Sequence, residues 1–172
     1  MDLKSFSKRI IPIQSRLYRI ARMYLPVIQD AEDMVQDTFL KLWNRRHDLD
    51  RYESLEALAV QTVRNGCLDK IKSHGYSKTI SGDAVMERTE TGQTPHQEIE
   101  NNNNEELIRR LISKLPEPQR LIIHLRDVEE YSFEEIESVT QLEINNIRVI
   151  LSRARKKIKE EYLKYHRYGT RD

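Results

Sequence analysis

The 172-residue sequence is poor in the residue types on which many extracellular, metal-binding and catalytic proteins depend. Its one cysteine, Cys67, excludes an internal disulfide and leaves no second thiol for a metal site. The five glycines are isolated from one another, so the sequence has no glycine-rich loop that could hold a phosphate group. The five histidines are scattered without the spacing of metal ligands. These absences predict a protein that is not an enzyme and that uses neither a cofactor nor a small-molecule substrate.

Long apolar runs are also missing. No run approaches the roughly 20 residues that span a bilayer as a helix. The N-terminal stretch MDLKSFSKRIIPIQ lacks the continuous apolar centre of a secretory signal. With 38% hydrophobic and 33% charged residues, the composition is typical of a helical protein with a large wetted surface. We therefore expect one or two small domains in a cytoplasmic or otherwise reducing compartment.

The net charge of +1 conceals a separation of charge toward the C-terminus. Residues 127–143 contain seven acidic residues and no lysine or arginine. Residues 148–171 contain nine basic residues and only two acidic ones, Glu160 and Glu161. Because local charge sets electrostatic contact with nucleic acid, the last part of the chain is a candidate DNA-binding element.

Apolar residues recur every three or four positions through residues 3–25, 30–43 and 54–73, which predicts three helices. Pro12 predicts a kink or a late start in the first helix. Asp30 and Asp33 resemble a capping box for the second helix, and Gly75 has the position of a C-cap for the third. Three helices with short connections predict a compact bundle.

The helix predicted over residues 30–43 has two faces that require different partners. One stripe is apolar apart from a threonine and has the width of a core face; it consists of Ala31, Met34, Val35, Thr38, Phe39, Leu42 and Trp43. The opposite face is acidic over its first two turns and then carries a large apolar residue, Leu40. That face is either the solvated back of an ordinary helix or a docking surface for a basic protein, and this segment alone leaves both interpretations open.

The pattern stops at residues 76–104, which contain no Leu, Phe or Trp and end in four asparagines. A segment that cannot bury apolar surface cannot offset its ordering entropy, so we expect a flexible linker here. It would separate a first domain, residues 1–75, from a second domain, residues 105–172.

The second domain is predicted to contain four helices. The first two cover residues 105–115 and 116–127, and a short third helix follows Ser132, whose spacing to Glu135 is that of a capping box. After a brief turn, a long basic helix begins at about Asn145. A short helix, a turn and a basic helix form the arrangement of a helix-turn-helix, in which early side chains read base edges and later ones hold phosphates. Taken alone, the last helix could equally present a solvated basic face.

Both blocks resemble parts of one family. DAEDMVQDTFLKLW resembles the polymerase-core-binding segment (region 2.2) of sigma-70 family factors, and closely that of the extracytoplasmic-function (ECF) group. LPEPQRLIIHLRDVEEYSFEEIESV and NNIRVILSRARKKIKE resemble region 4 of the same family. The resemblance covers about residues 5–75 and 105–162. It implies an all-α fold of two small helical domains, a three-helix region 2-like bundle and a four-helix region 4-like helix-turn-helix domain, joined by a flexible linker.

The resemblance also assigns roles to individual positions. The coiled coil of the polymerase β′ subunit is basic and suits an acidic partner; the positions matching its contact surface are Asp30, Glu32, Asp33, Gln36, Asp37 and Leu40. The −10 element, where a base is extruded from the melted strand, is assigned to residues 44–53 and the outer face of the third helix, with the candidates Arg45, Arg46, Arg64, Asn65, Lys70 and Lys72. For Arg64, a simple surface charge remains an alternative. The −35 readers, which enter the major groove of duplex DNA, would be Asn145, Asn146, Arg148, Val149, Ser152, Arg153, Arg155 and Lys156.

The recognition helix departs from the commoner family pattern. Many members have Ser or Thr as its N-cap and then a Gly, where this chain has Glu143 and Asn145. A familiar guanidinium is replaced by Ile150, and Val149 suggests apolar contact with a thymine methyl group. These differences concern which −35 sequence is read.

The resemblance implies a promoter-specificity subunit of bacterial RNA polymerase without catalytic residues of its own. Its partners would be core RNA polymerase, promoter DNA and a membrane-associated anti-sigma factor. The alternative is an autonomous, dimeric helix-turn-helix regulator, which would explain the basic C-terminal helix but would leave the acidic face around Leu40 without a purpose.

Overall fold

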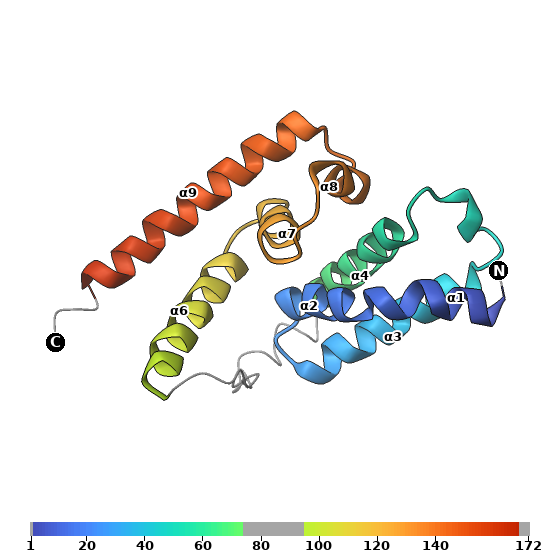
Figure 1. Cartoon of the computed structure of the whole chain (residues 1–172), viewed down its shortest axis with the longest axis horizontal. Helices are drawn as coiled ribbons and strands as arrows, with labels where there is room; N and C mark the ends of the chain where they lie inside the picture. The colour runs from blue at the N-terminus through green and yellow to red at the C-terminus, as the bar shows by residue number, and fades with distance from the viewer. Residues whose placement is uncertain (1, 74–94, 169–172) are drawn as a thin grey trace. The chain divides into compact units, whose positions relative to one another are not determined.

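A computed structural model describes residues 2–73 and 95–168 (Figure 1). All regular structure within these ranges is helical, and no strand occurs there. The chain divides into two compact units, one N-terminal and one C-terminal. The predicted all-α fold with two small helical domains is therefore confirmed.

The first unit is a bundle in which α2, α3 and α4 each pack against the other two. The predicted break at Pro12 is confirmed, because a single 3₁₀ turn around this proline divides the first helix. The helices of this unit are α1 (Leu3–Ile10), η1 (Ile11–Ile13), α2 (Gln14–Tyr24), α3 (Ile28–Asn44), η2 (Leu49–Arg51) and α4 (Leu55–Lys72).

Most of the apolar stripe predicted on α3 lies in the core of the first unit, as expected. Ala31, Met34, Val35, Thr38 and Leu42 are buried, while Phe39 and Trp43 at its margin are half-buried. The one polar member is satisfied within its own helix, because the Thr38 hydroxyl donates a hydrogen bond of 2.8 Å to the Met34 carbonyl. Cys67 on α4 is fully buried in the core of this unit.

Of the two caps predicted for the first unit, only the one at Asp30 lies among the described residues. The capping box at Asp30 is wrong: α3 begins at Ile28, its N-cap is Val27, and no side chain caps it. Ser54, which was not predicted as a cap, caps α4 through a hydrogen bond of 3.0 Å from the Ala57 amide to its hydroxyl. The proposed C-cap Gly75 and residues 76–94 of the predicted linker lie outside the described residues.

The contact between α3 and α4 depends on one glycine. A Cβ atom added at Gly66 would lie 2.5 Å from Sδ of Met34, well inside van der Waals contact. The absence of a side chain at Gly66 therefore lets the buried Met34 occupy the space between the two helices.

In the second unit, α9 packs against α6 and α7. Its first helix begins at Pro95, inside the segment expected to be a linker, so the domain boundary predicted at residue 105 cuts through a helix. The side chains at the centre of this unit are fully buried and include Leu121, Ile122, Leu125, Ile136 and Ile147. Its helices are α6 (Pro95–Ser113), α7 (Gln119–Ile123), η3 (His124–Val128), α8 (Phe133–Thr140) and α9 (Ile144–Tyr168).

The segment η3 is π-helical, whereas the sequence predicted an uninterrupted α-helix through residue 127. The Glu129 amide donates to the His124 carbonyl five residues earlier, at 3.0 Å. Both side chains are buried, with 3.3 Å between Nε2 of His124 and Oε1 of Glu129. A π turn holds an additional residue, which shifts the side chains that follow around the helix axis.

The helix-turn-helix is formed by α8, a three-residue turn and α9. The predicted capping box at the start of α8 is confirmed: the Glu135 amide donates to Oγ of Ser132 at 3.1 Å, and the Ser132 amide donates to Oε2 of Glu135 at 2.7 Å. Gln141 ends α8 in the left-handed conformation, with φ 59°. The helix α9 then begins at Ile144, close to the predicted start at Asn145.

Candidate functional site

An exposed acidic face runs along α3, opposite its buried stripe. At 3.6 residues per turn its members fall within an arc of about 140°, with Leu40 near the middle. Leu40 is a large apolar residue, but it is 60% exposed because the buried stripe of α3 lies on the other side of the helix. We call this surface the acidic face; it consists of Glu32, Asp33, Gln36, Asp37 and Leu40.

Asp30 does not share the exposure of the acidic face. Its carboxylate accepts a hydrogen bond of 2.7 Å from the ammonium group of Lys70 on α4, and the two side chains are only 24% and 30% exposed. One predicted polymerase contact and one predicted −10 contact are therefore paired with each other. This ion pair joins α3 to α4 across 40 residues of sequence.

The other −10 candidates on α4 lie together. Arg64, Asn65 and Lys72 fall within an arc of about 100° on the helix, with Arg64 half-buried and the other two exposed. Lys70 is about 140° away from Asn65, on the side of α4 that meets α3. The structure thus groups three of the four predicted residues on this helix.

Arg45 and Arg46 lie at the end of α3, where the chain turns toward η2. Arg45 is exposed. Arg46 is half-buried, with its guanidinium carbon 4.5 Å from the centre of the Trp43 ring and Nη1 donating to the Trp43 carbonyl at 3.2 Å. Trp43 is in turn held edge-on by Phe6, with 5.2 Å between ring centres. Arg46 is therefore restrained, and Arg45 is the more accessible of the two.

All eight predicted −35 residues are exposed on α9, opposite the buried Ile147, Leu151 and Ala154. Asn145, Val149, Ser152 and Lys156 follow one line along the helix, within an arc of about 60°. Asn146 and Arg153 lie along one edge of this line, and Arg148 and Arg155 lie along the other. We call this surface the reading face.

The two arginines at the second edge are both engaged with η3 or α8. Arg155 forms a two-pronged ion pair with Asp127: Nε donates to Oδ2 at 2.9 Å and Nη2 donates to Oδ1 at 2.5 Å. The hydrogen bond with Asp127 raises the pKa of the Arg155 guanidinium, which therefore stays charged. The guanidinium carbon of Arg148 lies 5.0 Å from the centre of the Phe133 ring.

Two residues beside the reading face were missed in the sequence. Arg126 on η3 places its guanidinium carbon 4.8 Å from the centre of the same Phe133 ring. The sequence placed Arg126 within a predicted helix and Phe133 directly after a predicted cap, and it indicated no further role for either residue. An aromatic side chain directly after the N-cap of the short helix, with an arginine in the preceding turn, is the signal that could have indicated them.

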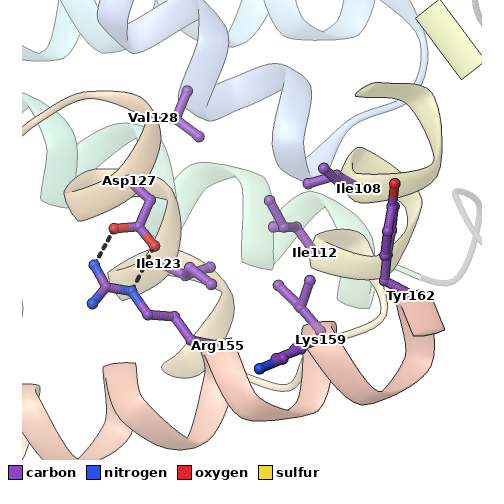
Figure 2. A pocket seen from close by; sticks show the side chains of 9 residues that line it. Ile108, Ile112, Ile123, Asp127, Val128, Arg155, Lys159 and Tyr162 are labelled. Carbon is purple, nitrogen blue, oxygen red and sulfur yellow. Dashed lines mark hydrogen bonds and ion pairs between the residues drawn. The ribbon is translucent and has the colours of Figure 1, made fainter. Parts of the chain in front are cut away.

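An apolar groove of about 340 Å³ lies between α6, η3 and α9 (Figure 2). Figure 2 shows the Asp127–Arg155 pair at one end of the groove and Ile108 with Tyr162 at the other. Val128 at its margin is 48% exposed. Of the α9 residues that line it, Arg155, Ile158 and Tyr162 lie about 90–150° around the helix from the central line of the reading face, whereas Lys159 lies about 50° from it. The groove is lined by Ile108, Ile112, Ile123, Asp127, Val128, Arg155, Ile158, Lys159 and Tyr162.

Within residues 2–73 and 95–168, no three histidine, cysteine or carboxylate side chains come together as a metal site. None of the helices described is both long and apolar enough to cross a bilayer.

Two family models match the chain, in the order of its two units. The model described as Sigma-70 region 2 matches residues 12–76, and the model described as Sigma-70, region 4 matches residues 105–158. Among curated proteins, the ECF RNA polymerase sigma factor SigM of Bacillus subtilis is 26% identical, with 83% of this chain and 88% of SigM covered. The ECF RNA polymerase sigma-E factor of Escherichia coli K12 is 28% identical, with 91% of this chain and 86% of its own length covered.

Solved structures of similar fold include two sigma factors bound to their inhibitors. The sigma factor RpoE from Bartonella quintana, in complex with the anti-sigma factor NepR, has a TM-score of 0.69 at 22% identity, covering 92% of this chain and 96% of that one. CnrH, in complex with the cytosolic domain of CnrY, has a TM-score of 0.65 at 20% identity, covering 94% of this chain and 89% of that one. At these identities the structural likeness shows the fold, while the ordered region 2 and region 4 matches and the ECF relatives show the family. The chain belongs to the ECF group of the sigma-70 family and is an RNA polymerase sigma factor, the subunit that directs core polymerase to specific promoters when transcription begins.

Proposed function

We propose that the two units divide the sigma function between them. The first domain, residues 1–75, would bind core polymerase and the −10 element. The second domain, residues 105–172, would read the −35 element. The observation that carries this proposal is the pair of exposed surfaces of opposite chemistry. An acidic face with an apolar centre lies on α3, and a basic, amide-bearing reading face lies on α9.

For core binding, the acidic face suits a basic helical partner such as the β′ coiled coil. Complementary charge steers the encounter, and an apolar residue at the centre of a polar surface supplies the desolvated contact. Leu40 has this central place, with Asp33 and Asp37 close to it on the same face. The ion pair of Asp30 with Lys70 supports a structural role for these two residues in place of a direct partner contact.

For the −10 element, the exposed side chains at the end of α3 and on the outer side of α4 are the proposed contacts. Arg45, Asn65 and Lys72 are exposed, and Arg64 is half-buried beside them on α4. Cationic and amide groups can follow the backbone of a melted strand and hydrogen-bond an extruded base. The proposed role of Arg46 is indirect, because its guanidinium group lies over the Trp43 ring and restrains that side chain.

For the −35 element, α9 would lie in the major groove with its N-terminal half against base edges. Asn145 and Arg148 carry groups that can hydrogen-bond bases, and the exposed Val149 suits a thymine methyl group. Lys156, about two turns beyond Val149, suits a phosphate. Arg155 is already paired with Asp127, so its proposed contribution to DNA contact is smaller than that of Lys156.

The proposal also covers regulation and place of action. The protein would act in the cytoplasm, where the polymerase and promoter DNA are found, and would supply specificity without a catalytic residue. A membrane-associated anti-sigma factor is the proposed regulator; RpoE and CnrH are known in complexes with NepR and CnrY. The alternative of an autonomous dimeric regulator is not favoured, because both family matches and the named relatives are sigma factors.

Charge reversal on the acidic face tests the proposal. The double variant Asp33→Lys/Asp37→Lys should weaken binding to core polymerase in a fluorescence titration, because it replaces two complementary charges with repulsive ones. Asp69→Lys is the matched control, since Asp69 is an exposed acid of the same unit that belongs to α4 and not to α3. Circular dichroism should show unchanged helicity in both variants. Unchanged core affinity in the double variant would exclude the docking role of this face, and promoter protection without core polymerase would favour the autonomous regulator.

A further inference from the structure

Phe133 is the meeting point of two arginines that are far apart in the sequence. The guanidinium carbons of Arg126 and Arg148 lie 4.8 and 5.0 Å from the centre of its ring. These distances are within the range of cation–π attraction. Arg148 belongs to the reading face, whereas Arg126 and Phe133 belong to the elements that precede it.

The Phe133 ring is restrained by the helix start to which it belongs and by Arg126 on η3. Phe133 is the first residue of α8, directly after the reciprocal hydrogen bonds of Ser132 and Glu135 that fix the start of this helix. Its ring is half-buried. Arg126 is itself anchored, because Nη1 donates a hydrogen bond of 2.6 Å to the carbonyl of Tyr131, two residues before Phe133. The ring and the first guanidinium are thus restrained before any DNA is bound.

Stacking on a ring is compatible with base recognition by the same arginine. The guanidinium group is planar: its faces stack on aromatic rings, and its N–H donors lie at its edges. A bidentate contact with O6 and N7 of guanine uses the edge. A stacked Arg148 can therefore keep its donors available while it loses much of the rotamer freedom of a long side chain.

We propose that Phe133 is a positioning residue for Arg148: by stacking on its guanidinium, it fixes the orientation in which Arg148 reads one base pair of the −35 element. This inference rests on the proposed function of the reading face. It makes the start of α8, which lies outside the recognition helix, a determinant of base preference at one position. Arg126 secures the ring from the preceding turn.

The test uses holoenzyme assembled from core polymerase and the full chain, with duplexes selected by the wild-type holoenzyme from a pool randomised across the upstream promoter element. Arg148→Ala first identifies the position that Arg148 reads, as the position whose base preference it removes. Phe133→Leu and Phe133→Met keep an apolar side chain but remove the ring, and Phe133→Tyr keeps the ring. Circular dichroism checks that each variant is folded.

We expect Phe133→Leu and Phe133→Met to reduce base preference about two- to fivefold at the Arg148 position and not elsewhere. Phe133→Tyr should retain the preference. In the Arg148→Ala background, Phe133→Leu should have no further effect, since the side chain that it positions is gone. In the free protein, NMR relaxation of the Arg148 Nε–H group should show greater mobility in Phe133→Leu than in wild type.

Three results would overturn the inference. If Phe133→Leu leaves the preference unchanged, or weakens binding equally at every position, Phe133 has no positioning role while the proposed −35 function stands. If Phe133→Tyr loses the preference as fully as Phe133→Leu, the ring is not the source of the effect. If Arg148→Ala changes no position, the assignment of Arg148 to base reading fails, and the inference falls with it.

Discussion

Leu40 provides the sharpest test of the acidic face, because it is the one apolar side chain there. Complete burial of a leucine contributes about 1.5–3 kcal/mol relative to full exposure. Leu40 is 60% exposed, so covering its remaining surface with a partner would contribute about 1–2 kcal/mol. We therefore expect Leu40→Ala to weaken binding to core polymerase about five- to thirtyfold.

The measurement is a titration of core polymerase against the fluorescently labelled full chain, at low and high salt. Ile11→Ala is the matched control, since Ile11 is 64% exposed in the same unit but lies in η1, away from the acidic face. The defect of Leu40→Ala should persist at high salt, because apolar contact is not screened by ions. The defect of Asp33→Lys/Asp37→Lys should instead become smaller as salt rises.

Equal affinities of Leu40→Ala and wild type would refute the reasoning, as would an equal loss in Ile11→Ala. The first result would mean that Leu40 stays in water when the polymerase is bound. The second would mean that loss of any exposed apolar side chain in this unit weakens binding, so that the place of Leu40 within the acidic face has no special importance.

Two further predictions concern the packing of α3 on α4. In a double-mutant cycle of Asp30→Asn and Lys70→Met, denaturant unfolding of the first unit should show a coupling of about 1 kcal/mol, since the pair is partly buried; no coupling would exclude its structural role. Gly66→Ala should gain about 1 kcal/mol of helix propensity, but overpacking against Met34 should outweigh this and lower the melting temperature. The same substitution should raise the melting temperature in a Met34→Ala background, and equal shifts in both backgrounds would contradict the predicted contact.

The sequence predicted the fold where one local rule was sufficient. The 3.6-residue period placed the buried stripe of α3, including Thr38, because a threonine can return its hydroxyl to the helix carbonyl four residues earlier. The spacing of Ser132 and Glu135 predicted the start of α8, because both hydrogen bonds of a capping box are made within four residues. The same periodicity placed all eight predicted −35 residues on an exposed surface.

The errors arose where contacts between distant segments decide the outcome. Asp30 had the spacing of a cap, but its carboxylate pairs with Lys70, which no local pattern indicates. The same ion pair places Lys70 on the side of α4 that meets α3, apart from the other predicted −10 residues of this helix, and its contact with the −10 element stays a prediction. The polar segment ending in four asparagines predicted no structure, yet α6 begins at Pro95 and continues through them. The groove and the Phe133 cluster each combine side chains from separate helices, so neither leaves a periodic signal in the sequence.

The π turn of η3 makes the length of this part of the chain as important as its composition. Removing a single residue between His124 and Val128 would let the segment relax to an ordinary α-helix, with no change in its polarity. Each residue of an α-helix advances by about 100°, so the same segment wound as an ordinary α-helix with all its residues kept would rotate one flank relative to the other by about that angle. Arg126 and Asp127 could not then both keep their places, one over the Phe133 ring and the other against Arg155. Related sequences in which this segment winds as an ordinary α-helix should therefore be one residue shorter here.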